Sequence, residues 1–579
     1  MNEIEKMPKQ ILVKALNEAL DQARKKGLLK SEAEAEIQIQ RPADASFGDY
    51  STNLAMLLAK GAGLPPRKVA EILAAELKAP EEVIEKVEVA GAGFINFRLS
   101  PRWLQKKVEQ IEREGADYGS AQTGCGRRLQ VEFVSANPTG PLHVGHGRAA
   151  ALGDVLANLL TKVGYEVTRE YYVNDAATSS QIRKFGESLE ARYLQALGQE
   201  AEMPEDGYHG EYVTEIAREL EQKKGDRYLQ MPASGRLEEF TRLAKERVLE
   251  GQRADLAAFG VRHDLWFQES TLFESGAVEA ALELLKEGGH TYEAEGALWL
   301  RSTDFGDEKD RVLVRSNGIP TYLAADAAYH HNKFNRGFDK VIDIWGPDHH
   351  GYVARTKAAV QALGYAPERL EIIIHQIVRL FSGGEMVRMS KRAGDIILLS
   401  EVLNEVGADA ARFFFLMRSA DSHLDFDLEL AKKETPDNPV YYVQYAHARI
   451  CSIFRQVARP LAATAAAGGG LAAEENGVKS PEPGKADLSL LAHARELDLL
   501  RKLADFSEEI EFAASLCEPH RLTRYAQELA STFHLFYTDC RVLGDDPALT
   551  AARLALTRAT QIVLRNTLAL LGISAPEKM

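Results

Sequence analysis

The sequence predicts an α/β protein in which a central parallel-sheet domain lies between an α+β N-terminal domain and an all-α C-terminal bundle. Three observations predict this fold. A β-α-β pattern runs from residue 129 to 173, strands and helices alternate again from 312 to 380, and helical periodicity dominates from residue 437 onward. A chain of 579 residues has room for about three to five folding units. We therefore expect domains at 1–115, 116–435 and 436–579.

The first domain is expected to be a self-contained α+β module. Apolar residues recur with helical spacing over 11–20, and a second helix is expected near 51–60. The segment Val87–Phe97 alternates at both ends around a Gly-x-Gly bend, which predicts a hairpin. A charged helix, Pro101–Glu114, leads toward the central domain.

The central domain begins with a predicted strand at 129–134, a polar loop and an amphipathic helix that ends at Gly164. Glu166–Val173 is the next strand, so this unit starts a parallel sheet. Residues 195–300 are charge-rich and predicted to form a helical insertion. Further strands are expected at 312–315, 340–345 and 371–380. The C-terminal bundle is interrupted by an Ala/Gly/Pro-rich linker over 461–488.

The charge distribution distinguishes the three parts. The net charge is −15, but residues 1–115 carry 18 basic and 18 acidic side chains, and residues 436–579 carry 15 and 17. The remaining 37 basic and 50 acidic side chains lie in the centre. The flanking domains can therefore present local basic faces to a nucleic acid, although net acidity alone would argue against one.

The cysteines and the hydropathy pattern indicate the compartment. Four widely spaced cysteines argue against a disulfide scaffold and a Cys-based zinc site. The N-terminus has no apolar signal-peptide core, and no stretch approaches the ~18 apolar residues of a membrane span. We expect a cytoplasmic protein that acts without a membrane.

A His-x-x-His pattern at a predicted helix start is the strongest chemical signal. Exposed amides and the helix dipole favour a phosphate beside His143 and His146. The glycines Gly145 and Gly147 would let a base or sugar approach the backbone. Two alternatives remain: the histidines only cap the helix, or Gly145–Ala150 is a dinucleotide fingerprint with Glu170 as its ribose-binding acid.

A second signal lies about 245 residues later. Glycines flank a short basic segment over 388–392, which contains Met389, Ser390 and Lys391. Such a segment can bring a lysine onto a transferring phosphate. The combination of this segment with the histidine pair is far more specific than either part.

Together these two motifs resemble the HIGH and KMSKS motifs of class I aminoacyl-tRNA synthetases. The segments 131–148, 172–175, 206–212, 321–326 and 346–352 are similar to bacterial arginyl-tRNA synthetases, and the resemblance runs along the whole chain. It implies a class I Rossmann-like catalytic domain, an N-terminal tRNA-binding domain and a helical anticodon-binding domain. Arg388 and Arg392 depart from the pattern, which has lysine and serine there, and the turn after Asp175 is longer than expected.

The resemblance also implies the reaction and its residues. ATP, accompanied by Mg²⁺, would activate L-arginine for transfer to tRNA(Arg), with no metal held by the protein. His143, His146 and Lys391 would be catalytic. The residues implied for ATP are His143, Gly145, His146, Gly147, Met389, Ser390 and Lys391. Those implied for arginine are Glu132, Ser135, Asn137, Tyr322, Asp326, Asp348 and His349, and those implied for tRNA are Tyr441, Tyr445 and Arg449.

Physical chemistry supports part of this assignment. A guanidinium group is best bound by carboxylates, and Tyr322 and Asp326 have the i, i+4 spacing of one helix face. Without the resemblance, Tyr322 and Asp326 would be interpreted as an ordinary pair on a helix surface. In the same way, Tyr441 and Tyr445 would be interpreted as side chains that pack in the core of the bundle. The resemblance places the segment 47–53 near the tRNA elbow.

Several alternatives stay open at this point. His349 and His350 could form a metal site with His330 and His331. The chain could also be a non-catalytic tRNA-binding paralogue, a small nucleotidyltransferase, or a synthetase for another amino acid. We expect a monomer.

Overall fold

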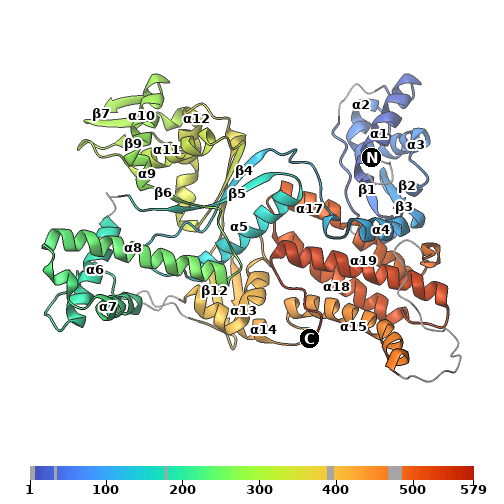
Figure 1. The fold of residues 1–579 in the computed structure, drawn as a ribbon. Coiled ribbons are helices and arrows are strands. Elements are labelled where there is room, and N and C mark those ends of the chain that lie inside the picture. Colours follow the sequence, from blue (N-terminus) through green and yellow to red (C-terminus); the bar gives the residue numbers. More distant parts are fainter. Residues whose placement is uncertain (1–6, 31–34, 43, 177–179, 388–396, 467–485) are drawn as a thin grey trace.

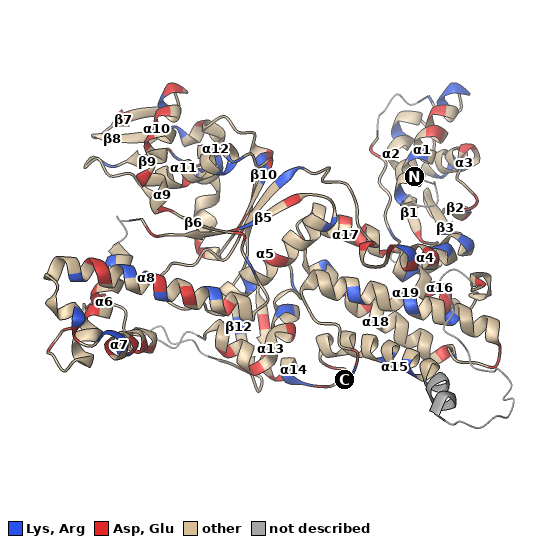
Figure 2. Cartoon of the chain, viewed as in Figure 1, with Lys and Arg blue, Asp and Glu red and all other residues tan. Residues whose placement is uncertain are grey.

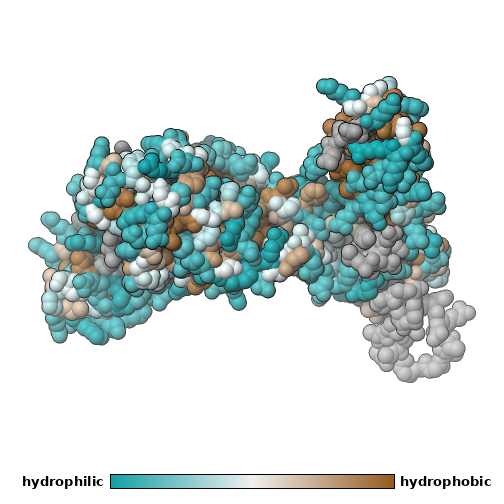
Figure 3. Space-filling view, turned by 90° about the horizontal axis from the view of Figure 1, so that it is seen from above, coloured by the Kyte–Doolittle hydropathy of each residue, from teal (hydrophilic) through white to brown (hydrophobic). Residues whose placement is uncertain are grey.

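The computed structural model describes residues 7–30, 35–42, 44–176, 180–387, 397–466 and 486–579. The molecule is elongated (Figure 1). The N-terminal domain stands above the helical bundle at one end, and a twisted central sheet connects this end to the rest of the chain. Viewed from above, the surface is mainly hydrophilic, and apolar side chains appear in separate patches (Figure 3).

The central sheet is parallel, as the sequence predicts, and it has five strands. In spatial order these are β11 (Leu370–Ile374), β10 (Lys340–Trp345), β4 (Arg128–Glu132), β5 (Glu166–Val173) and β6 (Leu265–Gln268). Helix α5 (Val144–Lys162) connects β4 to β5, and α11 (Tyr322–Asn335) precedes β10. From β4 the chain proceeds to β5 and β6 on one side, and it later returns to β10 and β11 on the other side. The strand order therefore reverses between β4 and β10.

The expectation of a helical insertion over 195–300 is wrong for its second half. The helices α6 (Ser180–Ala196), α7 (Glu211–Lys224) and α8 (Ala233–Ala258) project to one side in Figure 1, but β6 is an edge strand of the central sheet. Its four residues are too short to give a period-two signal among charged neighbours. Ion pairs between neighbouring turns lie along these helices, where both signs of charge alternate (Figure 2).

Two other strand predictions need correction. The strand expected at 312–315 forms as β9 (Arg311–Val314), but it belongs to a separate antiparallel sheet with β7 (Thr291–Ala294) and β8 (Ala297–Leu300). Short helices α9 (Ser270–Glu274), α10 (Ala277–Glu287) and α12 (Val353–Ala362) lie in the same region. The apolar stretch 371–380 is two strands, because the chain leaves the central sheet after β11 and enters a small second sheet as β12 (Val378–Ser382). That sheet also contains β13 (Glu385–Met386) and β14 (Leu424–Asp427), and helices α13 (Leu399–Phe415) and α14 (Leu428–Lys432) flank β14 in the chain.

The N-terminal domain has a three-stranded antiparallel sheet covered by helices. Its strands are β1 (Tyr50–Thr52), β2 (Ile84–Ala90) and β3 (Phe94–Leu99), and its helices are α1 (Pro8–Lys25), α2 (Leu54–Ala62), α3 (Pro66–Glu76) and α4 (Pro101–Glu114). The predicted hairpin is β2–β3, which is confirmed. The second helix starts later than expected, because residues 50–52 pair with β3 as a strand.

The C-terminal part is helical, as predicted. It contains α15 (Pro439–Ala466), α16 (Ala494–Ala504), α17 (Phe506–Ser515), α18 (His520–Asp539) and α19 (Pro547–Leu571). Within the expected linker, α15 continues to residue 466, and residues 467–485 lie outside the described residues. Short 3₁₀ turns connect several elements: Ala45–Phe47, Gly115–Asp117, Arg227–Gln230, Ser302–Phe305, Pro347–Tyr352, Pro367–Arg369 and Leu488–Leu490.

Polar contacts fix the N-terminal domain to this bundle. Arg41 forms ion pairs with Asp505 at 2.6 Å and with Glu508 at 3.0 Å, and the Tyr50 hydroxyl donates to Glu508 at 2.9 Å. The Tyr118 hydroxyl donates to the Leu503 carbonyl at 3.0 Å. The two outer parts of the molecule are thus joined directly as well as through the central domain.

Candidate active site

The reversal of strand order locates the candidate site. In open parallel sheets, ligands bind outside the carboxyl ends of the strands where the order reverses. Here β4 ends at Glu132, Asp343 lies beside Glu132 in register on β10, and the loop after β4 leads to the start of α5. His143 and His146 therefore reach the same edge of the sheet as these two carboxylates.

The histidines form a stacked pair at the N-terminus of α5. Their ring centroids are 3.7 Å apart and their planes are inclined by 22°. The Gly145 N–H donates to Nδ1 of His143 at 3.1 Å, and the His143 N–H donates to Nδ1 of His146 at 3.2 Å. Because each Nδ1 accepts a hydrogen bond, each neutral ring carries its proton on Nε2. The histidines do cap the helix, and this capping fixes two Nε2–H donors.

These imidazoles are neutral donors and not cations. Burial lowers the pKa of His143, and burial together with His143 and His375 lowers the pKa of His146 well below its usual range. They can donate hydrogen bonds to phosphate oxygens without carrying a charge. The remaining attraction for an anion comes from the helix terminus and from any cation nearby.

The two glycines of the motif have different roles. A Cβ at Gly145 would contact only the His143 ring, at 3.0 Å. A Cβ at Gly147 would lie 2.7 Å from Leu399 and 3.0 Å from Phe415, and Gly147 is buried. The expectation that Gly147 admits a ligand is therefore corrected, because the missing side chain makes room for α13.

The chain that follows the predicted basic segment lies beside the start of this helix. Met389, Ser390 and Lys391 lie outside the described residues. The chain after this segment is bound to the histidine motif: the Val144 N–H donates to the Ile397 carbonyl at 3.1 Å, and the Leu399 N–H donates to the Leu142 carbonyl at 2.9 Å. The chain that follows the second motif is thus held at the first motif.

The carboxylates at the ends of β4 and β10 are already paired. Lys333 of α11 bonds Glu132 at 2.6 Å and Asp343 at 2.8 Å, and all three side chains are buried. Nε2 of His330 lies 2.8 Å from the other oxygen of Asp343. The other oxygen of Glu132 accepts from the Ser135 hydroxyl at 2.9 Å. Glu132 therefore supports the floor of the site, and its expected role as a free acceptor for the substrate ammonium is not what this geometry favours.

The backbone immediately after β4 is strained. Val134 and Ser135 have φ of 73° and 42°, in the left-handed region that a β-branched residue rarely adopts. This bend ends the strand two residues earlier than predicted. The Ser135 hydroxyl accepts from the Tyr172 N–H at 3.1 Å, and Asn137 is exposed, with its amide 3.3 Å from Gln181. Such strain is typical of functional sites, and here it presents Asn137 to the crevice.

The predicted pair Tyr322 and Asp326 lies on the first turns of α11, as expected. The Tyr322 side chain is 61% exposed, so it is not an ordinary packed aromatic. The pKa of Asp326 is raised to about 6, because burial and, less strongly, Glu132 raise it more than His330, His349 and Lys333 lower it. No hydrogen bond or ion pair of the Asp326 carboxylate is found within the described residues. Asp326 is therefore available for a cationic ligand.

A second buried carboxylate, Glu269, was not predicted from the sequence. It follows β6, is 3% exposed, and its Oε2 has no hydrogen-bond partner in the described part of the chain. Burial raises its pKa to about 7, and Asp326 and Asp175 contribute to the shift. Asp175 itself is neutralised by Lys245 at 2.9 Å. The sequence gives only a weak indication of this role. Glu269 can be placed at the site only once β6 is known to belong to the central sheet.

The segment after β10 lies at the rim of the site. Asp348 and His349 are exposed on the turn Pro347–Tyr352, with 3.3 Å between His349 Nε2 and Asp348 Oδ2. His330 is buried against Asp343, whereas His331 contacts the Tyr365 hydroxyl at 2.8 Å. The proposed four-histidine metal site does not form, and no group of three or more metal-binding side chains occurs in the described ranges.

The dinucleotide alternative fails on Glu170. This carboxylate is fully buried and accepts from Arg336 at 2.6 and 2.9 Å and from the Tyr329 hydroxyl at 2.6 Å. Both oxygens are engaged inside the domain, so Glu170 is not available to bind a ribose.

The predicted tRNA-binding residues form one cluster on the bundle. The rings of Tyr441 and Tyr445 are parallel to within 7° with centroids 6.3 Å apart. The Arg449 guanidinium lies 5.2 Å from the Tyr445 ring and 4.8 Å from the Tyr537 ring. All three predicted residues are partly exposed, which separates them from the bundle core.

Comparisons with known proteins match all three parts of the chain. Residues 9–99 match the arginyl-tRNA synthetase N-terminal domain, 107–421 the class I (R) tRNA synthetase catalytic domain, and 443–579 the DALR anticodon-binding domain. The arginine–tRNA ligase of Moorella thermoacetica is 52% identical over 571 residues, which is 99% of each chain. The one from Carboxydothermus hydrogenoformans is 53% identical over 96% of each.

The chain belongs to the arginyl-tRNA synthetase family. The solved structure of the Thermus thermophilus arginyl-tRNA synthetase agrees in fold, with a TM-score of 0.74 and 26% identity over 99% of this chain and 100% of that chain. The class I catalytic domain, the N-terminal domain and the helical C-terminal domain predicted from the sequence are thus confirmed. Among the described helices, none is long and apolar enough to cross a membrane.

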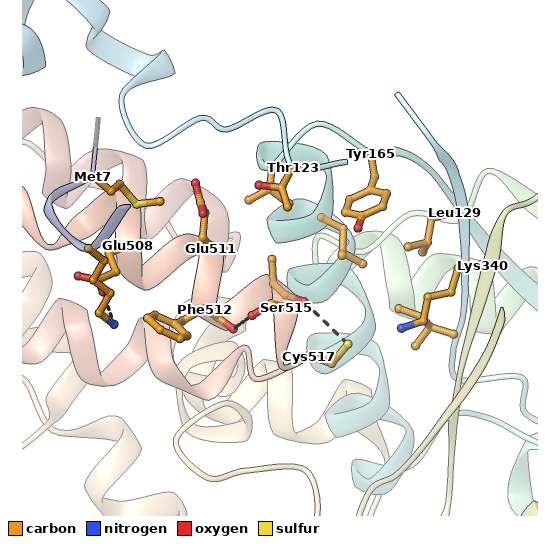
Figure 4. A pocket seen from close by; sticks show the side chains of 15 residues that line it. Met7, Thr123, Leu129, Tyr165, Lys340, Glu508, Glu511, Phe512, Ser515 and Cys517 are labelled. Carbon is orange, nitrogen blue, oxygen red and sulfur yellow. Dashed lines mark hydrogen bonds and ion pairs between the residues drawn. The ribbon is translucent and has the colours of Figure 1, made fainter. Parts of the chain in front are cut away.

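Within this synthetase fold, a cavity of about 300 Å³ lies between α17 and the central sheet (Figure 4). It is bordered by the amino ends of β4 and β10, by α5 near Val163, and by Glu511 and Cys517 around α17. The candidate site lies at the opposite, carboxyl end of the same strands. This cavity is therefore a feature of the domain junction and not the site of the histidines.

Proposed function

We propose that this chain is an arginine–tRNA ligase. A carboxylate oxygen of L-arginine attacks the α-phosphorus of ATP, which releases pyrophosphate and forms arginyl-adenylate. The 2′-hydroxyl of the terminal adenosine of tRNA(Arg) then attacks the arginyl carbonyl carbon, and AMP leaves. The observation that supports this best is two carboxylates without a bonded cation among the described residues, the half-buried Asp326 and the buried Glu269, at the same edge of the sheet as a helix N-terminus that carries two imidazole donors.

The arginine would bind over α11 and the end of β6. A guanidinium group offers five donors in one plane, and two carboxylates can accept them as a fork. Arginine binding would supply the missing cation for Asp326 and Glu269, with Tyr322 as an aromatic wall. Ser135 and Asn137 would receive the polar end of the substrate, and Glu132 would hold this floor through Lys333 and Ser135. Asp348 and His349 would line the rim toward the adenosine.

The triphosphate, as its Mg²⁺ complex, would bind at the start of α5. His143 and His146 would donate their Nε2–H groups to phosphate oxygens, and Gly145 would leave the backbone accessible. Since the charge on these oxygens grows during displacement, fixed donors stabilise the transition state. From the resemblance, Met389, Ser390 and Lys391 would complete this side.

The tRNA would contact the outer domains, with boundaries proposed at 1–115, 116–435 and 436–579. Bases of the anticodon loop can stack on Tyr441 and Tyr445 beside Arg449. One chain supplies both halves of the active site, so the proposed reaction needs only a monomer. The free thiols Cys125, Cys451, Cys517 and Cys540 fit a reducing compartment such as the cytoplasm.

Pyrophosphate exchange tests the activity directly. Labelled pyrophosphate should enter ATP when arginine and tRNA(Arg) are both present, and charged tRNA should accumulate when pyrophosphate is absent. Lysine serves as the control amino acid because it has charge but no planar fork. If arginine supported no exchange with or without tRNA, the proposed function would be rejected.

A further inference from the structure

Arg148 is a fully buried arginine that the proposed reaction does not yet use. It lies on α5, five residues after His143, and its guanidinium donates to three backbone carbonyls. Nη1 bonds the carbonyls of Gln376 and Ser422, and Nη2 bonds that of Ser419, each at 2.8 Å. These acceptors belong to the connection between β11 and β12 and to the turn before β14.

The charge of Arg148 is not neutralised by a bonded carboxylate. Arg412 is almost as deeply buried, but it bonds Asp154 at 2.5 Å. Arg148 has only carbonyl partners among the described residues, and its Nε has none. Asp421 acts on it only at longer range. A buried cation held by carbonyl dipoles keeps its outward field, whereas one paired with a carboxylate largely cancels it.

This field acts where the histidines lie. Nδ1 of His375 lies 3.3 Å from the same Gln376 carbonyl that Arg148 bonds, so both side chains share one acceptor. Burial lowers the pKa of His375 to about 4, with further lowering by Arg148 and His143. His375 in turn acts on His146. Arg148, His375 and the stacked pair are therefore one cluster.

We propose that Arg148 is a positioning residue that supplies the fixed positive charge of the phosphate site, behind two neutral imidazoles. It also binds the start of α5 to the chain entering β12 and β14. This inference rests on the proposed function, because it assigns the charge to the ATP side of that site. Electrostatic stabilisation is strongest when the charge is already in place and water is excluded, and both conditions hold for Arg148.

Three variants separate charge from structure. Arg148→Met removes the charge, and Arg148→Lys keeps it with fewer donors. Arg369→Gln is the matched control: Arg369 also donates to two backbone carbonyls, Asp339 at 3.0 Å and Phe338 at 2.7 Å, but at the amino end of the sheet. Each full-length protein is assayed for arginine- and tRNA-dependent pyrophosphate exchange across ATP concentrations.

We expect Arg148→Met to lower kcat/KM for ATP by about 50-fold. In Arg148→Lys, kcat/KM for ATP should be about tenfold higher than in Arg148→Met. KM for arginine should change less than about threefold in both variants. Arg369→Gln should match the wild type. Histidine-labelled NMR adds a second readout: the pKa of His375 should rise in Arg148→Met and stay low in Arg148→Lys.

Three results would overturn the proposal. One is an Arg148→Met variant within about threefold of the wild type. Another is equal impairment of the lysine and methionine variants. The third is an unchanged pKa of His375. If Arg148→Met does not fold, Arg148→Lys decides alone, through retained exchange and a low pKa of His375. Exchange by the wild-type protein tests the proposed function separately.

Discussion

The two halves of the candidate site hold their charge in opposite ways. On the arginine side, the half-buried Asp326 and the buried Glu269 lack a bonded cation among the described residues. On the phosphate side, Arg148 is a buried base without a bonded acid, and the histidines are neutral. Each half thus has an unbalanced charge opposite in sign to the ligand proposed for it. On the floor of the site, by contrast, buried charges are paired, as in Lys333 with Glu132 and Asp343.

The difference between unpaired and paired charges shows which groups of the protein are stabilised only when a substrate binds. A buried unpaired carboxylate is unfavourable until a cation arrives, and the same holds for a buried cation that awaits phosphate. The resulting affinity is specific, because a neutral ligand leaves the penalty in place.

The largest expected effect comes from neutralising the arginine side. Asp326→Asn removes one acceptor charge while it keeps the side-chain shape, so KM for arginine should rise by about 100-fold or more. KM for ATP should change less than about threefold. Steady-state exchange measures both. Asp304→Asn, an exposed acid on a neighbouring turn, is the control. Equal loss for both substrates would mean that Asp326 is structural.

The phosphate side should respond in kcat. His146→Asn keeps an acceptor that can cap the His143 N–H, but it removes the Nε2–H donor. A hydrogen bond to a charged oxygen contributes about 1.5–3 kcal/mol, so kcat for adenylate formation should fall by about 30-fold. Single-turnover kinetics checks this, with the helix content followed by circular dichroism. A change in KM for arginine alone would contradict the assignment.

The pH dependence of the kinetic constants should distinguish the arginine side of the site from the phosphate side without any substitution. Guanidinium binding needs ionised carboxylates, and the pKa values of about 7 for Glu269 and about 6 for Asp326 mean that acid protonates both. kcat/KM for arginine should therefore fall below neutral pH. KM for ATP should stay flat from about pH 8 to 6.5, because the histidines are already neutral there.

Glu269→Gln sharpens this test. It should raise KM for arginine by about tenfold and move the acidic limb toward lower pH, since only Asp326 then titrates. Pyrophosphate exchange over a pH series measures both. An unchanged acidic limb would assign that titration to another group.

The smallest effect is expected at Gly147, which the structure assigns to packing. Gly147→Ala adds a methyl group against Leu399 and Phe415. Overpacking should lower the free energy of unfolding by about 1–3 kcal/mol, as measured by urea denaturation. The same substitution at Gly145, where only the His143 ring is near, should alter KM for ATP more than stability. The reverse result would restore Gly147 to the ligand site.

The parts predictable from the sequence were those with a local signal. The βαβ unit, the α5 helix and the C-terminal bundle have strong periodicity, and their positions are confirmed. Tyr322 and Asp326 were assigned through the family resemblance, and their i, i+4 spacing placed them on one helix face. Glu269 could not be found this way, because it joins the site only when a four-residue strand pairs with β5.

The roles of individual residues depended on tertiary contacts that no local pattern encodes. Gly147 looked like a ligand contact, but α13 returns from more than two hundred residues away to fill the space. Glu132 looked free until Lys333 was placed beside it. The sequence identified which residues gather at the site, whereas the structure shows which of them already have partners.

Arg412 has a consequence for how the chain is made. Its guanidinium bonds Asp154 on the α5 helix and the carbonyl of Leu571, which ends α19, at 2.8 Å. The acceptors of Arg412 are therefore complete only after Leu571, 159 residues later in the sequence, has been synthesised. Ribosomes synthesise proteins from the N-terminus. The buried hydrogen bonds of Arg412 in the catalytic domain therefore cannot all form while the bundle is still being translated. Truncation near the C-terminus should thus impair the distant catalytic core and not only tRNA recognition.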